Sequence, residues 1–424
     1  MLDVKLLRDS PEVIRKDLKK RGWTDKLPLV EEAVAADAEW RRSKKRVDDL
    51  RHAQNKLTLE IAAIKKSGKD AKDKLAEVKG IPAEISDLEK TATVLQSRVK
   101  GILMSLPNIL HESVPVGADE NGNVTVRSWG KPRKFDFPAK DHVDLLTDLG
   151  LVDIERAAKI SGARFFFLKG DAFLLEQSIM RYAVDFLTGR GFTAVGPPLM
   201  MRKEAYAGVV DLADFGPVIY KVEGDDLYLI ATSEHPLTAM HMDEILAGDS
   251  LPRKYCGFSP NFRVEAGAHG KDTKGIFRTH QFYKVEQVVL SKPENSWAVH
   301  EQLIANAEAI FQSLGLHHRV VNICTGDIGT VAAKKYDLEA WMPVQRKFRE
   351  MVSCSNVTDY QARRLMIRYK EKQGSEPALV HTLNSTAVTT RALVALVENF
   401  QEKDGSISIP RPLWPYMGGR EKIS

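Results

Sequence analysis

Several charged and aromatic residues of this 424-residue chain have types and spacings suited to phosphate and carboxylate chemistry. Phe262-Arg263-Val264-Glu265 comes first, and Arg278, Phe282 and Glu286 follow at intervals of four. Residues an even number apart on a strand share a face, so a strand over 278–286 would present a guanidinium, an aromatic ring and a carboxylate together. Arginine is the natural ligand of phosphate and carboxylate, and an aromatic ring can stack on a base.

Two further groups lie downstream. Glu350-Met351-Val352-Ser353 contains oxygen donors of the kind that Mg²⁺ prefers, and Arg391 opens a predicted helix after Thr386-Ala387-Val388. Each group alone has a plainer interpretation, because an Arg–Glu pair is commonly a surface ion pair, a phenylalanine commonly core and a lone glutamate commonly solvated. The functional interpretation therefore depends on all of them occurring together and in this order.

The common nucleotide-binding motifs do not account for these residues. Gly267–Asp272 is like a P-loop, but Glu265 stands where the opening glycine belongs, and Asp272 stands where Ser or Thr must follow the lysine. No GxGxxG follows a predicted strand, and the sequence contains no HExxH. Phosphate-binding groups must come from the residues above.

Composition places the chain in a reducing compartment. Cys256, Cys324 and Cys354 are scattered and never in CxxC spacing, which excludes a disulfide framework and a recognisable zinc knuckle. No apolar run reaches the roughly 18–20 residues of a membrane helix, and the first ten residues are too charged for a signal peptide. We expect a cytoplasmic protein that does not enter a membrane.

The elements that must position these residues lie between 111 and 424. An amphipathic helix is predicted over 173–190, with further helices over 294–314, 357–366 and 386–401. Short strands are predicted at Val218–Val222, Leu227–Ile230, Gln281–Leu290, Arg319–Ile323 and Glu339–Met342. Because these runs are irregularly spaced and lack regular βαβ alternation, they favour an α+β body with a largely antiparallel sheet.

Residues 1–110 have a different pattern and include a predicted arm over about 29–102. Apolar residues recur every seven positions in two stretches separated by the polar turn Ser67–Asp70, which predicts an antiparallel coiled-coil hairpin. The repeats are Ala33, Trp40, Val47, Gln54 and Ile61 with Ala36, Ser43, Leu50, Leu57 and Ile64, and then Val78, Ile81, Ile85, Leu88, Ala92, Leu95, Val99 and Ile102. Gly80-Ile81-Pro82 interrupts the second stretch and predicts a kink or a late helix start.

Residues 1–110 also carry the chain's excess positive charge. Residues 1–110 hold 24 Lys and Arg against 18 Asp and Glu, whereas the remaining residues hold 38 against 39. A solvated helical face is the commoner meaning of such charge, but a basic rod also suits a polyanion such as nucleic acid. The outward basic residues are Arg41, Arg42, Lys44, Lys45, Arg46, Arg51 and Lys56.

Together these motifs resemble those of the class II aminoacyl-tRNA synthetases. The group from Phe262 to Glu286 is similar to motif 2, Gly191 through Pro198 to motif 1, and Leu383 through Asn399 to motif 3. The hairpin and Thr232-Ser233-Glu234 narrow the resemblance to the seryl-tRNA synthetases with a coiled-coil arm. Leu229–Pro236 and Thr273–Arg278 look like the archaeal branch, and the resemblance covers nearly the whole chain.

The resemblance implies a two-step reaction. L-serine and ATP give seryl-adenylate, and the seryl group then passes to the 3′ end of tRNA(Ser), and of tRNA(Sec) as well. The family further implies Mg²⁺ bound with ATP, no zinc, a homodimer formed through residues 173–198, a tRNA-binding domain over 1–110 and a catalytic domain over 111–424.

The same resemblance assigns roles to individual residues. Arg263, Glu286 and Arg391 would be catalytic, and Phe282 would stack on adenine with Arg391 on the opposite face. Serine would contact Thr232, Ser233, Glu234, Arg263, Glu286 and Thr386. ATP would contact Arg263, Val264, Glu265, Arg278, Thr279, Phe282, Glu350, Met351, Val352, Ser353 and Arg391, with Glu350 and Ser353 also holding Mg²⁺. Transfer RNA would contact Arg41, Arg42, Lys44, Lys45, Arg46 and Arg51.

Motif 3 departs from the family pattern in length. It runs seven residues from Asn384 to Arg391 instead of eight. Either one of Thr386 and Arg391 keeps its register, or the backbone before the helix absorbs the difference.

Two other functions stay open on the sequence. A class II relative could load an activated amino acid onto a carrier protein, although such a chain would have little use for a basic hairpin. A non-catalytic RNA-binding protein could keep the fold as a scaffold, although it would be expected to lose charged site residues that are all present here.

Overall fold

The computed structural model describes residues 1–265 and 275–424 and separates two units, Met1–Ile109 and Leu110–Ser424. Part of the motif stretch 273–278, and all of the P-loop-like segment 267–272, lie outside the described residues. Within the described ranges, no helix is both long and apolar enough to cross a lipid bilayer.

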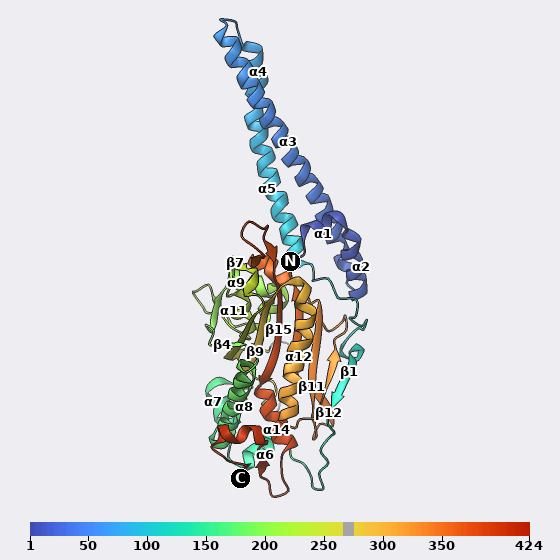
Figure 1. Ribbon diagram of the computed structural model, residues 1–424, viewed down its shortest axis with the longest axis vertical. Coiled ribbons are helices and arrows are strands. Elements are labelled where there is room, and N and C mark those ends of the chain that lie inside the picture. The colour runs from blue at the N-terminus through green and yellow to red at the C-terminus, as the bar shows by residue number, and fades with distance from the viewer. Residues whose placement is uncertain (266–274) are drawn as a thin grey trace. The chain divides into compact units, whose positions relative to one another are not determined.

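Unit 1 is a helical hairpin with two short helices at its base (Figure 1). Its helices are α1 (Val4–Asp9), α2 (Pro11–Arg21), α3 (Leu27–Lys66), α4 (Lys72–Lys79) and α5 (Ile81–Ser105). The predicted coiled-coil hairpin is confirmed, because α3 and α5 pack together along the seven-residue repeats. The predicted interruption is confirmed too: α4 ends before Gly80, and α5 starts with Pro82 in its first turn, where a missing N–H costs nothing.

The two helices at the base of the hairpin were not predicted. They bury Leu7, Ile14 and Leu18. A buried carboxylate, Asp37 on α3, accepts hydrogen bonds from Arg8 at 2.8 and 2.9 Å and from Arg41 at 3.0 Å. These contacts fix the base of the hairpin as a small folded region of its own.

Unit 2 is built on an eight-stranded sheet in the order β1-β10-β11-β12-β15-β9-β8-β4. All neighbouring strands are antiparallel except β4 and β8, so the predicted α+β class with an antiparallel sheet is confirmed. Its strands are β1 (Val124–Trp129), β4 (Thr193–Val195), β8 (Arg253–Phe262), β9 (Gln281–Ser291), β10 (His318–Asn322), β11 (Lys334–Met342), β12 (Lys347–Thr358) and β15 (His381–Thr389). Small sheets add β2 (Val152–Asp153), β3 (Phe167–Leu168), β5 (Met200–Arg202), β6 (Leu227–Leu229), β7 (Ile245–Ala247), β13 (Arg368–Lys370), β14 (Ala378–Leu379), β16 (Ile407–Ser408) and β17 (Lys422–Ile423).

The helices of unit 2 are α6 (His142–Asp148), α7 (Ile154–Ser161), α8 (Gly170–Thr188), α9 (Lys203–Val209), α10 (Leu212–Phe215), α11 (Glu234–Ala239), α12 (Ser296–Ser313), α13 (Tyr360–Leu365) and α14 (Thr390–Asn399). Helices α8 and α12 match their predictions closely. Two boundaries were wrong, because 357–358 end β12 and 386–389 end β15, whose polar residues resemble a helix cap. The predicted strand Val218–Val222 was also wrong, since only Lys221 forms an isolated bridge there.

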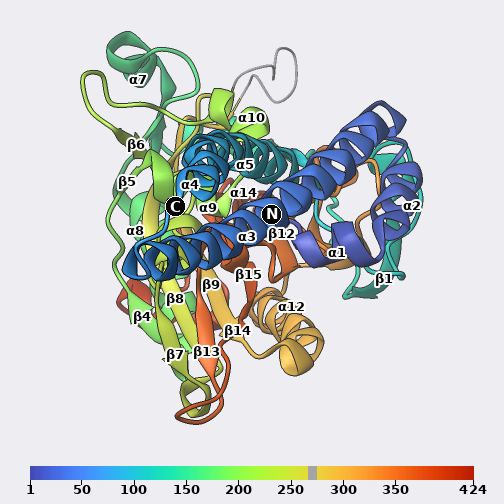
Figure 2. The same cartoon turned by 90° about the horizontal axis from the view of Figure 1, so that it is seen from above.

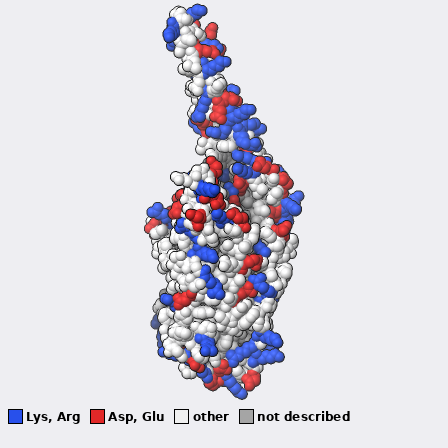
Figure 3. Space-filling model, in the orientation of Figure 1, with Lys and Arg blue, Asp and Glu red and all other residues white. Residues whose placement is uncertain are grey.

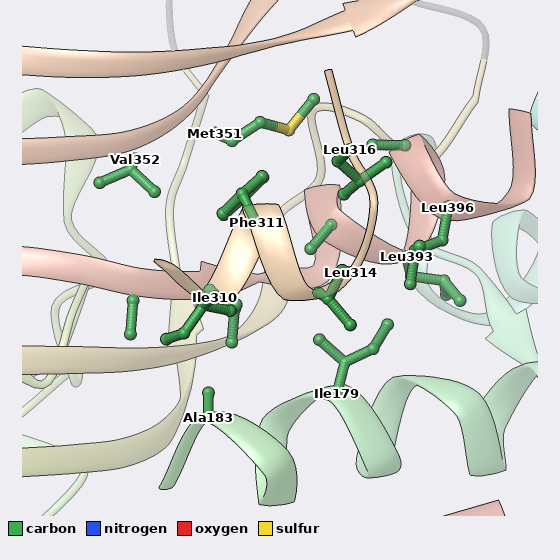
Figure 4. Packing of buried hydrophobic residues seen from close by; sticks show 14 of the residues in the cluster. Ile179, Ala183, Ile310, Phe311, Leu314, Leu316, Met351, Val352, Leu393 and Leu396 are labelled. Atoms are coloured by element: carbon green, nitrogen blue, oxygen red, sulfur yellow. The ribbon is translucent and has the colours of Figure 1, made fainter. Parts of the chain in front are cut away.

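One face of the sheet is covered by α8, α12 and α14 (Figures 1 and 2). Figure 4 shows the resulting core, in which Ile179 and Ala183 of α8 lie across from Phe311 of α12 and Leu393 of α14. Side chains on a strand alternate between faces, so the residues between the core positions point to the other face. Val285, Val352 and Leu383 face the core, and their neighbours are available for a site.

Candidate active site

A cavity of about 380 Å³ lies over these alternate residues of β9, β11, β12 and β15. Predicted residues in its wall are Glu234, Arg263, Glu265, Arg278, Thr279, Phe282, Glu286, Glu350, Met351, Ser353, Thr386 and Arg391. A second cavity of about 330 Å³ adjoins it, because both share Glu234, Arg263 and Asn384, and Thr232 lines this second cavity. Residues spread over more than 150 positions of sequence thus meet at one place.

Carboxylates and hydroxyls gather at the inner end of the first cavity. Glu286 on β9 is fully buried and faces Thr386 across the strand pair β9–β15. Lys284 Nζ lies 2.6 Å from Glu286 Oε2 and donates to Thr232 Oγ1 at 3.2 Å. Burial raises the pKa of Glu286 to about 7, against the attraction of Lys284, and the neighbouring Glu234 adds to the rise. Burial likewise raises the pKa of Glu234.

The shortened motif 3 keeps both of its predicted residues in the site. The pairing of β15 with β9 shifts register between Thr386 and Val388, which marks a bulge or irregularity at Ala387. Thr386 and Arg391 both line the cavity. The backbone before the helix therefore absorbs the difference in length.

Three arginines converge on the middle of the cavity, each held by a protein oxygen. Arg263 donates through Nε to the Ala231 carbonyl at 3.3 Å, and Arg278 donates to Glu265 Oε2 at 2.8 Å. Arg391 donates through Nη1 to the backbone oxygen of Glu350 at 2.9 Å and to its Oε2 at 3.2 Å. Such preorganised guanidinium groups suit the oxygens of a polyphosphate.

Two phenylalanine rings lie among these arginines. The Arg263 guanidinium lies over Phe282 at 5.1 Å from its ring centre, and Arg391 lies over Phe277 at 4.7 Å. In the structure, Arg391 therefore faces Phe277 instead of Phe282. Arg278 also differs from expectation, since β9 begins only at Gln281 and this arginine reaches the cavity from the preceding loop.

Glu350 and Ser353 on β12 lie in the wall next to Arg391 and Lys335. Desolvation opposes the ionisation of Glu350, but Arg391, Lys335 and Arg263 outweigh it and hold the pKa of this carboxyl below its usual value. An ionised carboxylate beside a hydroxyl is a donor set that fits Mg²⁺. In the described residues, no three His, Cys, Asp or Glu side chains gather as a metal site.

Three predicted contact residues do not reach the cavity. Ser233 Oγ donates to the Gly257 carbonyl at 3.2 Å, behind the wall. Val352 alternates with the wall residues and lies in the core, and Val264 N–H donates to the Val218 carbonyl at 2.8 Å. The spans TSE and EMVS were predicted as units, but successive side chains on the strand β12 point opposite ways, and Ser233 has helical dihedral angles at the start of α11.

Several wall residues were missed. Lys284, Lys335 and Asn384 line the cavity, together with Phe277. The sequence pattern could have placed Lys284 in the site, because this residue lies an even number of residues from both Phe282 and Glu286 and so shares their face of the strand. Lysine is seldom buried, which is why the pattern suggested no role for it.

The six basic residues predicted to bind tRNA all lie exposed on α3 of unit 1, where basic and acidic side chains alternate along the hairpin (Figure 3). Three of them are paired: Arg41 with Asp37 at 3.0 Å, Arg46 with Glu84 at 2.8 Å and Arg51 with Glu89 at 2.5 Å. Within the described part of the chain, Arg42, Lys44 and Lys45 form no ion pair. The residues predicted to bind tRNA thus divide into three that are paired with carboxylates and three that form no ion pair among the described residues.

Comparison with known families accounts for both units. Residues 1–110 match the seryl-tRNA synthetase N-terminal domain, and residues 219–400 match the tRNA synthetase class II core domain (G, H, P, S and T). The serine–tRNA ligase of Methanocella arvoryzae is 52% identical over 425 residues, with 100% of both chains covered.

Solved structures are similar over the same length. The crystal structure of seryl-tRNA synthetase from Pyrococcus horikoshii complexed with ATP matches with a TM-score of 0.97 and 50% identity, covering 100% of this chain and 99% of that one. The cytoplasmic serine–tRNA ligase of Naegleria fowleri in complex with AMP matches with a TM-score of 0.91 and 38% identity, over 100% and 99% of the two chains. This chain therefore belongs to the seryl-tRNA synthetase family, the class II enzymes that ligate serine to tRNA.

Proposed function

We propose that unit 2 carries out the family's reaction, the activation of L-serine by ATP and its transfer to tRNA, in the cavity described above. The observation that carries the assignment is the distribution of charge in one cavity. Carboxylates and hydroxyls at the inner end suit an ammonium and a hydroxyl, and three arginines suit a carboxylate and a polyphosphate. A zwitterionic amino acid and a nucleotide together match both ends.

In the first step, a serine carboxylate oxygen attacks the α-phosphorus of ATP, and the bond to pyrophosphate breaks. Negative charge spreads over the phosphate oxygens, so the site needs positioning and electrostatic stabilisation and uses no covalent nucleophile. Arg263 would bridge the serine carboxylate and the α-phosphate, with Arg278 and Arg391 on the outer phosphates. Mg²⁺, held by Glu350 and Ser353, would neutralise phosphate charge.

Serine recognition falls to the inner end of the cavity. Thr232 and Glu286 would receive the ammonium, Thr386 would face the hydroxyl, and Glu234 would border the same pocket. Phe282 would stack on adenine. Ser233 would act from behind the wall, by holding the backbone of Thr232 and Glu234 to β8 through its hydrogen bond with Gly257.

Unit 1 is proposed as the tRNA-binding domain, over about residues 1–110, with unit 2 as the catalytic domain. A basic rod touches mainly RNA backbone and reads shape more than sequence. Replacing residues 44–90 with a short Gly–Ser loop should leave pyrophosphate exchange within about twofold and lower the charging of tRNA(Ser) at least about tenfold, since phosphate contacts supply much of the affinity. Charging of tRNA(Sec) is proposed as well and is checked by the same transfer assay.

Two assays test the function against its alternatives. Serine-dependent exchange of ATP with labelled pyrophosphate requires adenylate formation, so a scaffold protein would show none. Transfer of labelled serine to tRNA(Ser) separates a synthetase from a relative that loads a carrier protein. Exchange stimulated by another amino acid in preference to serine would contradict the assignment.

A further inference from the structure

A lysine without an assigned role occupies the inner end of the cavity. Lys284 on β9 is 7% exposed, and its Nζ contacts both Glu286 Oε2 at 2.6 Å and Thr232 Oγ1 at 3.2 Å. These are the two groups proposed above to receive the ammonium of serine. A protein ammonium thus already contacts both groups that are expected to bind the substrate ammonium.

Burial makes this contact important for the charge of Glu286. A carboxyl group in a desolvated pocket takes up a proton unless a cation stabilises its charged form. With Lys284 in place, the pKa of Glu286 is already raised to about 7 by burial, and Glu234 raises it further. Without the lysine, the group would be largely protonated at neutral pH. A neutral carboxyl is a poor partner for an ammonium.

The other charged groups around Glu286 come from each neighbouring element. Glu234 begins α11, Arg263 follows β8, and Lys335 lies on β11. On β12 the Cys354 thiol lies on the core side of the sheet and donates to the His300 carbonyl at 3.8 Å, and burial raises its pKa. From β15 comes the uncharged Thr386. Lys284 is the cation in direct contact with Glu286.

We propose that Lys284 is a serine-positioning residue, the counter-ion that keeps Glu286 ionised and oriented for the substrate ammonium. The charges at the inner end are consistent with this role. Glu234 and Glu286 are balanced by Lys284 and Arg263, and serine adds one charge of each sign without requiring any group to leave. The inference rests on the proposed function, because it takes Glu286 as the ammonium partner.

The test compares Lys284→Gln with Lys284→Arg in serine-dependent pyrophosphate exchange between pH 6 and 8.5. In the unmodified enzyme, KM for serine should rise as the pH falls below about 7, since protonation removes the charge of Glu286. In Lys284→Gln this rise should begin at least about one pH unit higher, which makes KM for serine at least about fivefold higher at pH 7. The difference should shrink toward pH 8.5, and KM for ATP should stay within about twofold.

Lys284→Arg keeps the positive charge and should keep the inflection of the unmodified enzyme, even if its KM is higher throughout. The proposal is overturned if Lys284→Gln follows the unmodified pH curve, or if Lys284→Arg shifts the inflection as Lys284→Gln does. It is also overturned if KM rises equally for serine and ATP at every pH, which would mark a structural role. Absence of serine-dependent exchange in the unmodified enzyme would instead contradict the proposed function.

Discussion

The choice between serine and alanine depends on one hydroxyl group, and Thr386 is the residue placed to test it. It lines the cavity and faces Glu286 across two paired strands. Thr386→Val keeps the volume and removes the hydroxyl, so the serine hydroxyl would lose a partner. Because a single hydrogen bond contributes about 0.5–1.5 kcal/mol, the ratio of kcat/KM for serine over alanine should fall roughly 2- to 12-fold. Pyrophosphate exchange with each amino acid measures it.

Thr386→Ser is the matched control, since it keeps the hydroxyl and loses only a methyl group. Its preference for serine should remain close to that of the unmodified enzyme. An unchanged preference in Thr386→Val would mean that other groups hold the substrate hydroxyl.

At the residue scale, the sequence predicted the cavity residues best where the residue types and their order are uncommon outside such a site. Arginines, an aromatic residue and acids in motif order could be predicted, and most of them line the cavity. Lys284 and Lys335 could not, because the usual place of a lysine is the surface. Only the folded sheet shows that Lys284 is buried and that the Lys335 side chain is 20% exposed. Which of two neighbours points inward, as with Val352 and Ser353, depends on strand register, which is set by distant partners.

Among the elements, α8 is linked by the buried side chain of Glu176 to both sides of the proposed nucleotide site. Thr390 Oγ1 donates a hydrogen bond to the Glu176 carboxyl group on α8 at 2.6 Å. Thr390 Oγ1 in turn accepts a hydrogen bond from the Tyr283 N–H at 3.0 Å. Thr390 precedes Arg391, and Tyr283 follows Phe282. Glu176→Leu should therefore raise KM for ATP about tenfold, equal to roughly 1.4 kcal/mol, with KM for serine within about twofold.

Glu176→Gln keeps a hydrogen-bond acceptor of the same length and should restore KM for ATP to within about twofold. Steady-state pyrophosphate exchange at varied ATP gives both values. Equal effects of the Leu and Gln variants would show that the hydrogen bond to Thr390 does not position the site.

The basic residues of α3 lead to a separate prediction about salt. Arg42, Lys44 and Lys45 form no ion pair in the described structure, whereas Arg46 and Arg51 are bound to Glu84 and Glu89. Unpaired cations release counterions when they meet phosphate, at a slope of about −0.9 per contact. Replacing the three unpaired residues with Gln should make the slope of log kcat/KM for charging against log salt less negative by about 2–3.

The matched control replaces Arg46 and Arg51 with Gln. These residues already have carboxylate partners, so contact with RNA there would exchange a carboxylate for a phosphate. The slope of log kcat/KM against log salt should therefore change by less than about one. A larger change in the control than in the triple variant would reverse the assignment of the two groups. Filter binding of tRNA(Ser) at several salt concentrations gives an independent slope.

Element predictions succeeded where the pattern is local. The hairpin follows from a seven-residue repeat read along the chain, and Gly80 with Pro82 marks its break. Strands β12 and β15 were missed or misplaced because their cavity faces carry Ser, Asn and Thr, which are also loop and cap residues. Their strand character comes from pairing with β9 and β11, which are distant in sequence.

For the whole molecule we propose a homodimer formed through residues 173–198. Apolar side chains remain exposed in and just after this region: Phe173 and Leu174 at 43%, Leu199 at 38% and Met200 at 44%. Exposed large apolar side chains can mark an interface, and a two-fold axis would bring the same helix from both subunits together. Light scattering at micromolar concentration should give twice the chain mass of 47.4 kDa.

Phe173→Asp combined with Leu174→Asp should reduce the measured mass to that of one chain, because buried unpaired charges are costly. Ile160→Asp, at a residue 71% exposed on α7 outside the region, is the control and should leave the dimer intact. A mass of 47.4 kDa for the unmodified chain would contradict the proposal.

The break at Gly80 has a consequence for how the arm could change during evolution. Helix α3 runs unbroken to Lys66, whereas the returning half of the hairpin is divided into the two helices α4 and α5. Helix α5 has its own repeat positions, from Ile81 to Ile102, to fix its packing against α3, and the eight residues of α4 continue the same register through Val78. Insertions or deletions beyond the break can lengthen or shorten the tip without shifting the packing below it. The distal segment is thus free to adapt to tRNAs of different dimensions while the base keeps its fold.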